Sequence, residues 1–181
     1  MPPKRKRPTI KGLKTSQSSD DRPRKLLTVG SSSSGKTCLL IRYFMDRYPT
    51  GYIPHVMDNT RVNIPVFSRV VTLDLWDTPV LSLSYSDKLR PLIYVGTSVF
   101  LMCFGIDNPN SLSSLEEVWV PEVKRYTRDT RPPILLVGCK MDVRTDSVEL
   151  EKMRRNGGME PVSVQQGREV AKSIGAAMYL E

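Results

Sequence analysis

A loop pattern typical of phosphate binding stands at residues 29–40, VGSSSSGKTCLL. Gly30 and the triplet Gly35-Lys36-Thr37 fit G-x-x-x-x-G-K-[ST], in which the backbone N–H groups of a glycine-rich loop converge on phosphate oxygens. In this pattern Lys36 reaches the β- and γ-phosphates of a nucleotide, and Thr37 offers its hydroxyl to Mg²⁺. Four consecutive serines are also typical of a flexible linker, so the flanking residues decide between a spacer and a phosphate site.

The residues on either side of the loop favour a phosphate site. The apolar run RKLLTV ends at Gly30 and predicts a strand, and KTCLLIRYFM after Gly35 predicts a helix. Because a helix N-terminus carries partial positive charge, it strengthens the attraction of the loop for phosphate. The residues of this loop predicted to contact a nucleotide are Ser31, Ser32, Ser33, Ser34, Gly35, Lys36, Thr37 and Cys38.

Two acidic groups follow later apolar runs. LDLWDT, residues 73–78, places Asp77 at the end of a strand, where a carboxylate can hold a Mg²⁺-bound water. LLVGCKMD, residues 135–142, ends in K-x-D. There Asp142 would accept hydrogen bonds from both the ring N–H and the exocyclic amine of guanine, and the stem of Lys140 would lie on the base plane. Each motif alone is common by chance, but their order after the phosphate pattern makes the combination specific.

The remaining strands complete a sheet. TRVNIPVF (60–67) and RVVTLDLW (69–76) alternate around a short turn and predict a hairpin. Pro65 places the first of these at the sheet edge, because proline cannot donate to a strand ladder. Apolar runs predict two buried strands and a short last one, at residues 98–104, 133–139 and 176–181.

Helices alternate with these strands. We predict them at residues 110–127, with Asn110 or Ser111 as cap and a kink at Pro121, at 147–155, and at 163–174, where Gly175 ends the last one. Strands alternating with helices predict an α/β fold with a mostly parallel six-stranded sheet, one antiparallel edge strand and helices on both faces.

The net charge of +8 belongs to the first residues of the chain. Residues 1–25 carry nine Lys and Arg and two Asp, so the rest is nearly neutral and we expect no specific nucleic-acid partner. Residues 1–24 read as a disordered basic tail. Its PPKRKRP is also typical of a nuclear-import signal or of a contact with anionic membranes. No apolar run approaches the length of a membrane span, and isolated cysteines fit reduced thiols, so we expect a cytoplasmic monomer.

The loop pattern, LWDT and CKMD, in this order, resemble small GTPases. GKTCLLIRY, YIPHVMDN, LRPLIY, VFLMCF and GAAMYLE further resemble the Rho family, over residues 25–181. SVELEKMRRNGGMEPV is similar to the extra helix of Rho proteins, and VGCK and RRNGGMEPV to the RhoD-like branch. The resemblance implies a P-loop small G-protein domain that binds GTP or GDP with Mg²⁺, contacts Rho-type effectors and regulators, and acts in signal transduction to the actin cytoskeleton.

The resemblance also implies roles for individual residues. Tyr48 would stack against the guanine, and residues 79–87 would lie in switch II. Switch I, the effector loop, would comprise Tyr52, Ile53, Pro54, His55, Val56, Met57, Asp58 and Asn59.

Four departures from the Rho pattern gather at the γ-phosphate end. Ser32 replaces a glycine, His55 a Mg²⁺-binding threonine, Val80 a permissive glycine and Leu81 a water-orienting glutamine. Because Leu81 cannot hydrogen-bond a nucleophile, we assign no catalytic residue and expect weak GTP hydrolysis with nucleotide binding retained. Cys139 stands where the family has a stronger hydrogen-bonding residue, which weakens one tether of the base site.

The sequence ends at YLE, where the Rho pattern continues into a base-contacting loop, a final helix and a prenylated cysteine. We therefore expect a domain that lacks its C-terminal helix, exposes apolar sheet surface, and makes at most weak membrane contact through the tail. Two other classes stay open: a nucleotide-free pseudo-GTPase that acts as an interaction module, and a basic nuclear protein.

Overall fold

A six-stranded sheet with the strand order β2-β3-β1-β4-β5-β6 lies at the centre of the fold. The computed structural model describes residues 22–49, 59–67, 69–78 and 90–181. The strands are β1 Arg24–Val29, β2 Thr60–Val66, β3 Arg69–Asp77, β4 Thr97–Gly105, β5 Ile134–Cys139 and β6 Met178–Leu180. β2 runs antiparallel to β3, and all the other neighbours pair in parallel. The predicted α/β fold, with one antiparallel edge strand, is thus confirmed.

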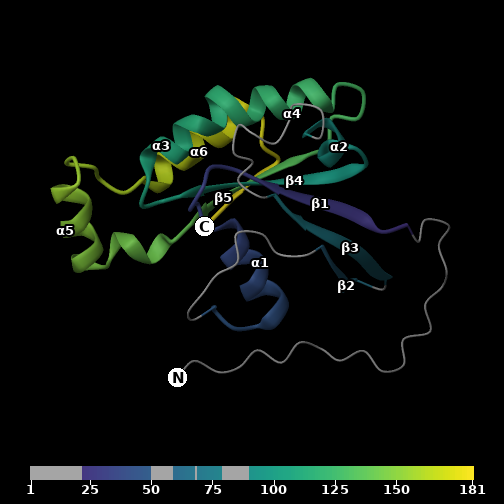
Figure 1. The fold of residues 1–181 in the computed structure, drawn as a ribbon, viewed down its shortest axis with the longest axis horizontal. Helices are drawn as coiled ribbons and strands as arrows, with labels where there is room; N and C mark the ends of the chain where they lie inside the picture. Colours follow the sequence, from purple (N-terminus) through teal and green to yellow (C-terminus); the bar gives the residue numbers. More distant parts are fainter. Residues whose placement is uncertain (1–21, 50–58, 68, 79–89) are drawn as a thin grey trace.

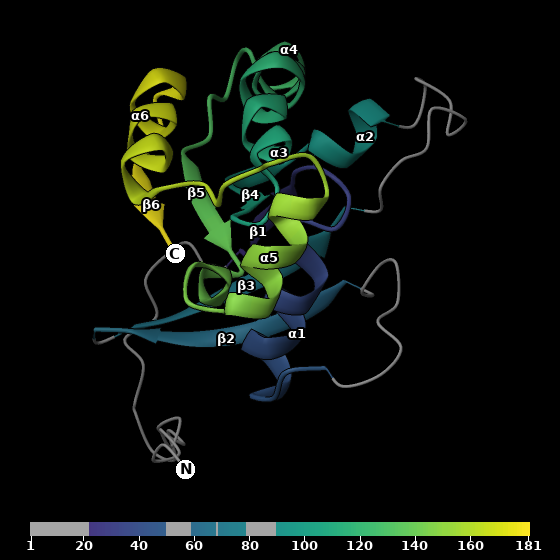
Figure 2. The same cartoon turned by 90° about the vertical axis from the view of Figure 1, so that its left-hand side faces the viewer.

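Helices cover both faces of this sheet (Figures 1 and 2). One face carries α1, and the other carries α2, α3, α4 and α6 (Figure 2). The helix α5 lies beyond the end of the sheet towards which β5 runs (Figure 1). The bounds are α1 Lys36–Met45, α2 Arg90–Tyr94, α3 Pro109–Ser114, α4 Val120–Tyr126, α5 Ser147–Arg155 and α6 Val164–Ile174.

The hydrophobic core lies between the sheet and the α3, α4 and α6 layer. Alternate residues of β4, namely Phe100, Met102 and Phe104, are fully buried there, and Leu27 and Leu136 join them from the neighbouring strands. Alternation places every second side chain on one face of a strand, so this face of β4 is apolar throughout. The packing fixes β1, β4 and β5 side by side, and their carboxyl ends share one edge of the sheet.

The hairpin forms as predicted. β2 pairs with β3 over Thr60 to Val66, and Pro65 lies in β2 at the sheet edge. Phe67 occupies the turn with a φ of 53°, a left-handed conformation that is uncommon for an aromatic residue.

The helix predicted for residues 110–127 differs in detail. It is divided into α3, a π-helical turn η1 Leu115–Trp119, and α4. Pro121 cannot donate a backbone hydrogen bond, and its ring crowds the preceding turn, so a widened turn directly before it relieves the conflict. The predicted cap was also wrong: the cap is Asn108, and Pro109 takes the first helical position. Ser111 instead ties the helix to β4, because its Oγ accepts a 2.9 Å hydrogen bond from the backbone N–H of Gly105.

The other helices form where they were predicted. Asp146 caps α5, and Ser163 caps α6 in a capping box with Gln166, while Gly175 ends α6 in a left-handed conformation. The short helix α2 and the 3₁₀ turn η2 Met141–Arg144 were not predicted, since neither is long enough to show a period. In the described ranges, no helix is long and apolar enough to cross a membrane.

Candidate nucleotide site

The loop between β1 and α1 lies tightly against the ends of β4 and β5. A β-carbon on Gly30 would lie 2.1 Å from the carbonyl oxygen of Cys103, and one on Gly35 would lie 2.9 Å from the β-carbon of Cys139. Both glycines have positive φ values, 139° and 101°. Glycine is therefore required at each position by close approach and by backbone conformation together. The loop is part of the folded sheet edge, which excludes the linker interpretation.

The amine of Lys36 lies inside this loop. Its Nζ donates hydrogen bonds to the backbone carbonyls of Gly30 (2.8 Å) and Ser31 (2.7 Å). An ammonium has three N–H donors, and these two bonds hold it at the inner side of the loop where phosphate would enter. Burial lowers the pKa of Lys36, with the nearby Asp77 acting in the opposite direction. A bound anion would offset the desolvation of this nearly buried charge.

Thr37 and Asp77 meet next to the lysine. Thr37 Oγ1 donates a 2.6 Å hydrogen bond to Asp77 Oδ2, across forty residues of sequence. Asp77 is only 5% exposed and ends β3, and the adjacent Thr78 donates a 2.7 Å hydrogen bond to the backbone carbonyl of Thr28 in β1. A hydroxyl and a carboxylate side by side are the hard oxygen donors that Mg²⁺ prefers, so the pair fits this ion.

The four serines of the loop have different environments. Ser31 accepts a 3.4 Å hydrogen bond at Oγ from the indole of Trp119, which η1 presents to the loop. Ser32 and Ser33 are both exposed, and Ser33 has a φ of 59°. Ser34 is 1% exposed, and its hydroxyl has no hydrogen-bond partner among the described residues. Ser32, the loop residue that departs from the Rho pattern, is therefore exposed.

The residues predicted for base recognition lie at the same edge, beyond β5. Lys140 has a left-handed backbone and donates a 2.6 Å charged hydrogen bond to Asp107 Oδ2. Asp142 is the second residue of the turn η2 and is exposed. Tyr48 is 64% exposed. The pKa of its hydroxyl is raised first by the neighbouring Cys38 and then by burial, with a further contribution from Asp142. Cys38 and Asp142 therefore lie close enough to Tyr48 to act on its hydroxyl, and Lys140 directly precedes the turn that holds Asp142.

Several predicted residues lie outside the described ranges. They are the part of switch I from Tyr52 to Asp58, including His55, and the switch II segment 79–87 with Val80 and Leu81. Asn59 is described and exposed.

Sequence reasoning did not identify Asp107 or Trp119. Asp77 was identified because it is an acidic residue at the end of a predicted strand. Asp107 follows the end of β4 in a similar way, so the same criterion would have found it. The contact of Trp119 depends on the π-helical turn, for which the sequence carries no clear signal.

The comparison with protein families matches residues 25–181 to the family described as Ras. The chain belongs to the Ras family. Within that family its similarity runs to Rho-type members. It is 43% identical over 158 residues to the GTP-binding protein RHO1 of Saccharomyces cerevisiae, covering 87% of this chain and 73% of that protein. The RHO1 protein of Candida albicans is likewise 43% identical, with 87% and 77% covered, and the Rho-related protein racI of Dictyostelium discoideum is 37% identical, with 87% and 76% covered.

The Ras-family match and the site geometry agree. Small GTPases of this family bind guanine nucleotide and Mg²⁺, and here the loop, Lys36, Thr37 and Asp77 lie at one sheet edge with Lys140 and Asp142. This edge is the carboxyl end of parallel strands, where open α/β sheets bind ligands.

Proposed function

We propose that this Ras-family protein binds GTP and GDP with Mg²⁺ and acts as a Rho-type signalling protein. The observation that carries the proposal is the joint arrangement of Lys36 and the Thr37–Asp77 pair behind a loop shaped by two required glycines. Lys36 would bind the β- and γ-phosphates. Thr37 would ligate Mg²⁺, which would neutralise phosphate charge, and Asp77 would orient Thr37 and a metal-bound water.

The base end supports guanine as the bound base. Asp142 offers two acceptor oxygens, which match the ring N–H and the amine of guanine and do not match adenine. Lys140, oriented by Asp107, would place its aliphatic stem along the base, with Tyr48 as the neighbour on α1's side.

GTP hydrolysis by this protein is proposed to be weak. Ser32 exposes its side chain on the loop where the Rho pattern has glycine, and a side chain there would crowd the attacking water. The residues at the other γ-phosphate positions, His55, Val80 and Leu81, cannot supply the usual Mg²⁺ and water contacts. Loss of a water-orienting residue costs orders of magnitude in rate, so we propose nucleotide binding with slow turnover.

The cellular setting is a further part of the proposal. We propose a cytoplasmic monomer of the RhoD-like branch that contacts effectors and regulators of Rho type in signalling to the actin cytoskeleton. The basic tail would add weak contact with anionic membranes or direct nuclear import.

The decisive experiment measures the nucleotide that purifies with the protein. Heat denaturation releases bound nucleotide, and anion-exchange chromatography of the supernatant identifies and quantifies it. Guanine nucleotide in about equal amount to protein supports the proposal. A nucleotide-free, folded protein that also fails to bind added fluorescent GDP would reject it and favour the interaction-module class. The Lys36→Ala variant is the matched control, because it removes the phosphate-binding amine from the same loop.

Turnover is tested separately with labelled GTP. Single-turnover release of phosphate should be much slower than that of ordinary Rho proteins measured alongside. An equal rate would contradict the role given to Ser32 and Leu81 while leaving nucleotide binding intact.

A further inference from the structure

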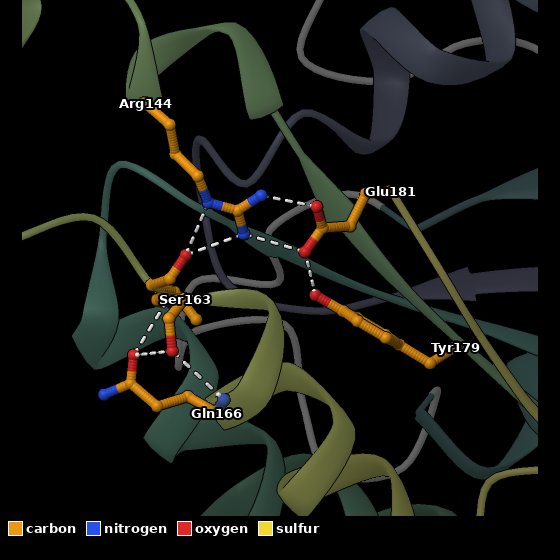
Figure 3. A network of polar contacts seen from close by, with 6 residues as sticks. Arg144, Ser163, Gln166, Tyr179 and Glu181 are labelled. Atoms are coloured by element: carbon orange, nitrogen blue, oxygen red, sulfur yellow. Dashed lines mark hydrogen bonds and ion pairs between the residues drawn. The ribbon is translucent and has the colours of Figure 1, made fainter.

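Arg144 joins three segments that are far apart in the sequence (Figure 3). Its guanidinium donates to both carboxylate oxygens of Glu181, at 2.5 and 2.7 Å, and to the backbone carbonyl of Val162, at 2.9 and 2.7 Å. Glu181 follows β6, and Val162 lies just before the cap of α6. A planar guanidinium that makes four hydrogen bonds has little freedom to move, so this contact fixes Arg144 in one orientation.

The partners of Arg144 are themselves held firmly. The Tyr179 hydroxyl donates to Glu181, and its ring stacks on Phe104 at 6.3 Å with a 10° interplanar angle. The ring also lies against Gly167 of α6, where a β-carbon would be 2.2 Å from the hydroxyl oxygen. The side chains of Arg144 and Glu181 are 24% and 14% exposed. Arg144 is therefore held by partly buried groups that β6 and α6 position.

The backbone of Arg144 belongs to the loop that carries Asp142. Both residues belong to the turn η2, and the backbone carbonyl of Asp142 accepts hydrogen bonds from the N–H groups of Thr145 (3.0 Å) and Asp146 (3.2 Å). This turn is short and closed, so its residues move together. The loop is anchored towards β4 by the bond from Lys140 to Asp107, and towards β6 and α6 by Arg144.

We infer that Arg144 is the positioning residue for guanine selection: by fixing the η2 turn to β6 and to the start of α6, it sets where the Asp142 carboxylate stands. Arg144 itself touches no base. This inference rests on the proposed function, because it assigns the means by which the proposed base site discriminates. Guanine would be selected by the hydrogen bond that Asp142 accepts from the exocyclic amine. This hydrogen bond depends on the position of one carboxylate oxygen.

Inosine diphosphate tests this directly, because hypoxanthine keeps the ring N–H of guanine and lacks the exocyclic amine. The experiment measures dissociation constants of GDP and inosine diphosphate, by competition against fluorescent GDP, for wild type and Arg144→Gln. We expect the preference for GDP to fall by about threefold or more in Arg144→Gln, because a displaced carboxylate loses the amine contact first. Arg154→Gln is the matched control, since Arg154 pairs with Glu160 on the surface at 3.6 Å and lies outside the loop.

A merely structural role gives a different result. If Arg144 only stabilised the fold, both nucleotides would bind more weakly by the same factor and their ratio would stay at the wild-type value, which would overturn the inference. Should Arg144→Gln fail to fold, Glu181→Gln gives the second test, because it keeps the shape and removes the charge that holds the guanidinium. An unchanged ratio in folded Glu181→Gln overturns the inference, and a reduced ratio supports it. Wild type that binds neither diphosphate would instead refute the proposed function itself.

Discussion

The Thr37 hydroxyl and the Asp77 carboxylate are 2.6 Å apart, which joins the start of α1 to the end of β3. In β1, the strand between these elements, the backbone carbonyl of Thr28 accepts a hydrogen bond from Thr78 at 2.7 Å. The two contacts fix the spacing of three elements at the phosphate end of the site. A metal ion placed here would find its hydroxyl ligand, Thr37, already oriented by the Asp77 carboxylate.

The Thr37–Asp77 contact predicts how nucleotide affinity depends on Mg²⁺. In Thr37→Ala the hydroxyl ligand is lost, so chelating Mg²⁺ should change the GDP dissociation rate little, whereas in wild type chelation should speed release by about tenfold or more. Release of fluorescent GDP with and without a chelator measures this. Thr37→Ser keeps the hydroxyl and serves as the control. A strong chelator effect in Thr37→Ala would show that the metal is not held through this residue.

Alanine substitutions at Gly30 and Gly157 would separate the cost of steric clash from the cost of backbone strain. Both have positive φ values, 139° and 116°, but a β-carbon on Gly30 meets the Cys103 carbonyl at 2.1 Å, whereas one on Gly157 meets nothing within 4 Å. Gly157→Ala should cost about 1–2 kcal/mol in the free energy of unfolding, from conformation alone. Gly30→Ala should cost about 4 kcal/mol or more, or prevent folding. Chemical denaturation compares the two, and equal losses would mean that the loop can move away from β4.

The sequence predicted the strands, the hairpin and the phosphate loop because each depends on local pattern. The apolar run before Gly30, the alternation of the two hairpin strands and the stop signal of Gly175 after α6 act over a few residues, and the structure follows them. Asp77 and Asp142 could be assigned to one edge because parallel strands end together. The π-helical turn and the cap at Asn108 were missed, because they follow from the conflict between Pro121 and the helix ladder and from the contact of Ser111 with β4.

The contacts between side chains at the site could not be predicted in this way. Lys140 was expected to lie along a base, and its amine is held by Asp107, thirty-three residues earlier. Arg144 belongs to none of the motifs in the sequence, yet it joins η2 to β6 and to the start of α6 (Figure 3). Both pairs arise from the order β4-β5-β6 in the sheet, which brings strand ends together irrespective of their distance in the sequence.

The ion pair between Lys140 and Asp107 predicts a specific effect on nucleotide release. The pair is 2.6 Å long with side chains 35% and 30% exposed. In Asp107→Asn the amine of Lys140 loses its charged partner, so its stem would no longer be fixed and GDP release should speed up by about three- to tenfold. The loss of unfolding free energy should stay at about 1 kcal/mol or less, because the pair is partly exposed.

The matched control is Asp74→Asn in the hairpin. Asp74 pairs with Arg61, also at 2.6 Å, away from the nucleotide site. This variant should leave the GDP release rate unchanged. Equal release rates in Asp107→Asn and Asp74→Asn would show that the Lys140 contact has no part in nucleotide binding.

The pair of Arg144 and Glu181 predicts how stability depends on pH. The hydrogen bonds from Arg144 lower the pKa of Glu181 below its ordinary value of 4.5, against the opposing effect of burial. The ionised carboxylate therefore contributes stability that is fully present above pH 4.5 and is lost as the pH falls through the lowered folded-state value. At pH 7, Glu181→Gln should be less stable by about 1 kcal/mol, which corresponds to about 2–4 °C in Tm.

Thermal unfolding of wild type and Glu181→Gln between pH 7 and pH 3 measures this difference. The two Tm values should differ at pH 7 and converge below pH 4.5, because a protonated glutamate, like glutamine, carries no charge for Arg144. Arg144→Gln also removes the hydrogen bonds to the Val162 carbonyl, so its difference in Tm from wild type should narrow below pH 4.5 without vanishing. A difference in Tm that stays constant down to pH 3 would mean that Glu181 acts through its packing and not through its charge.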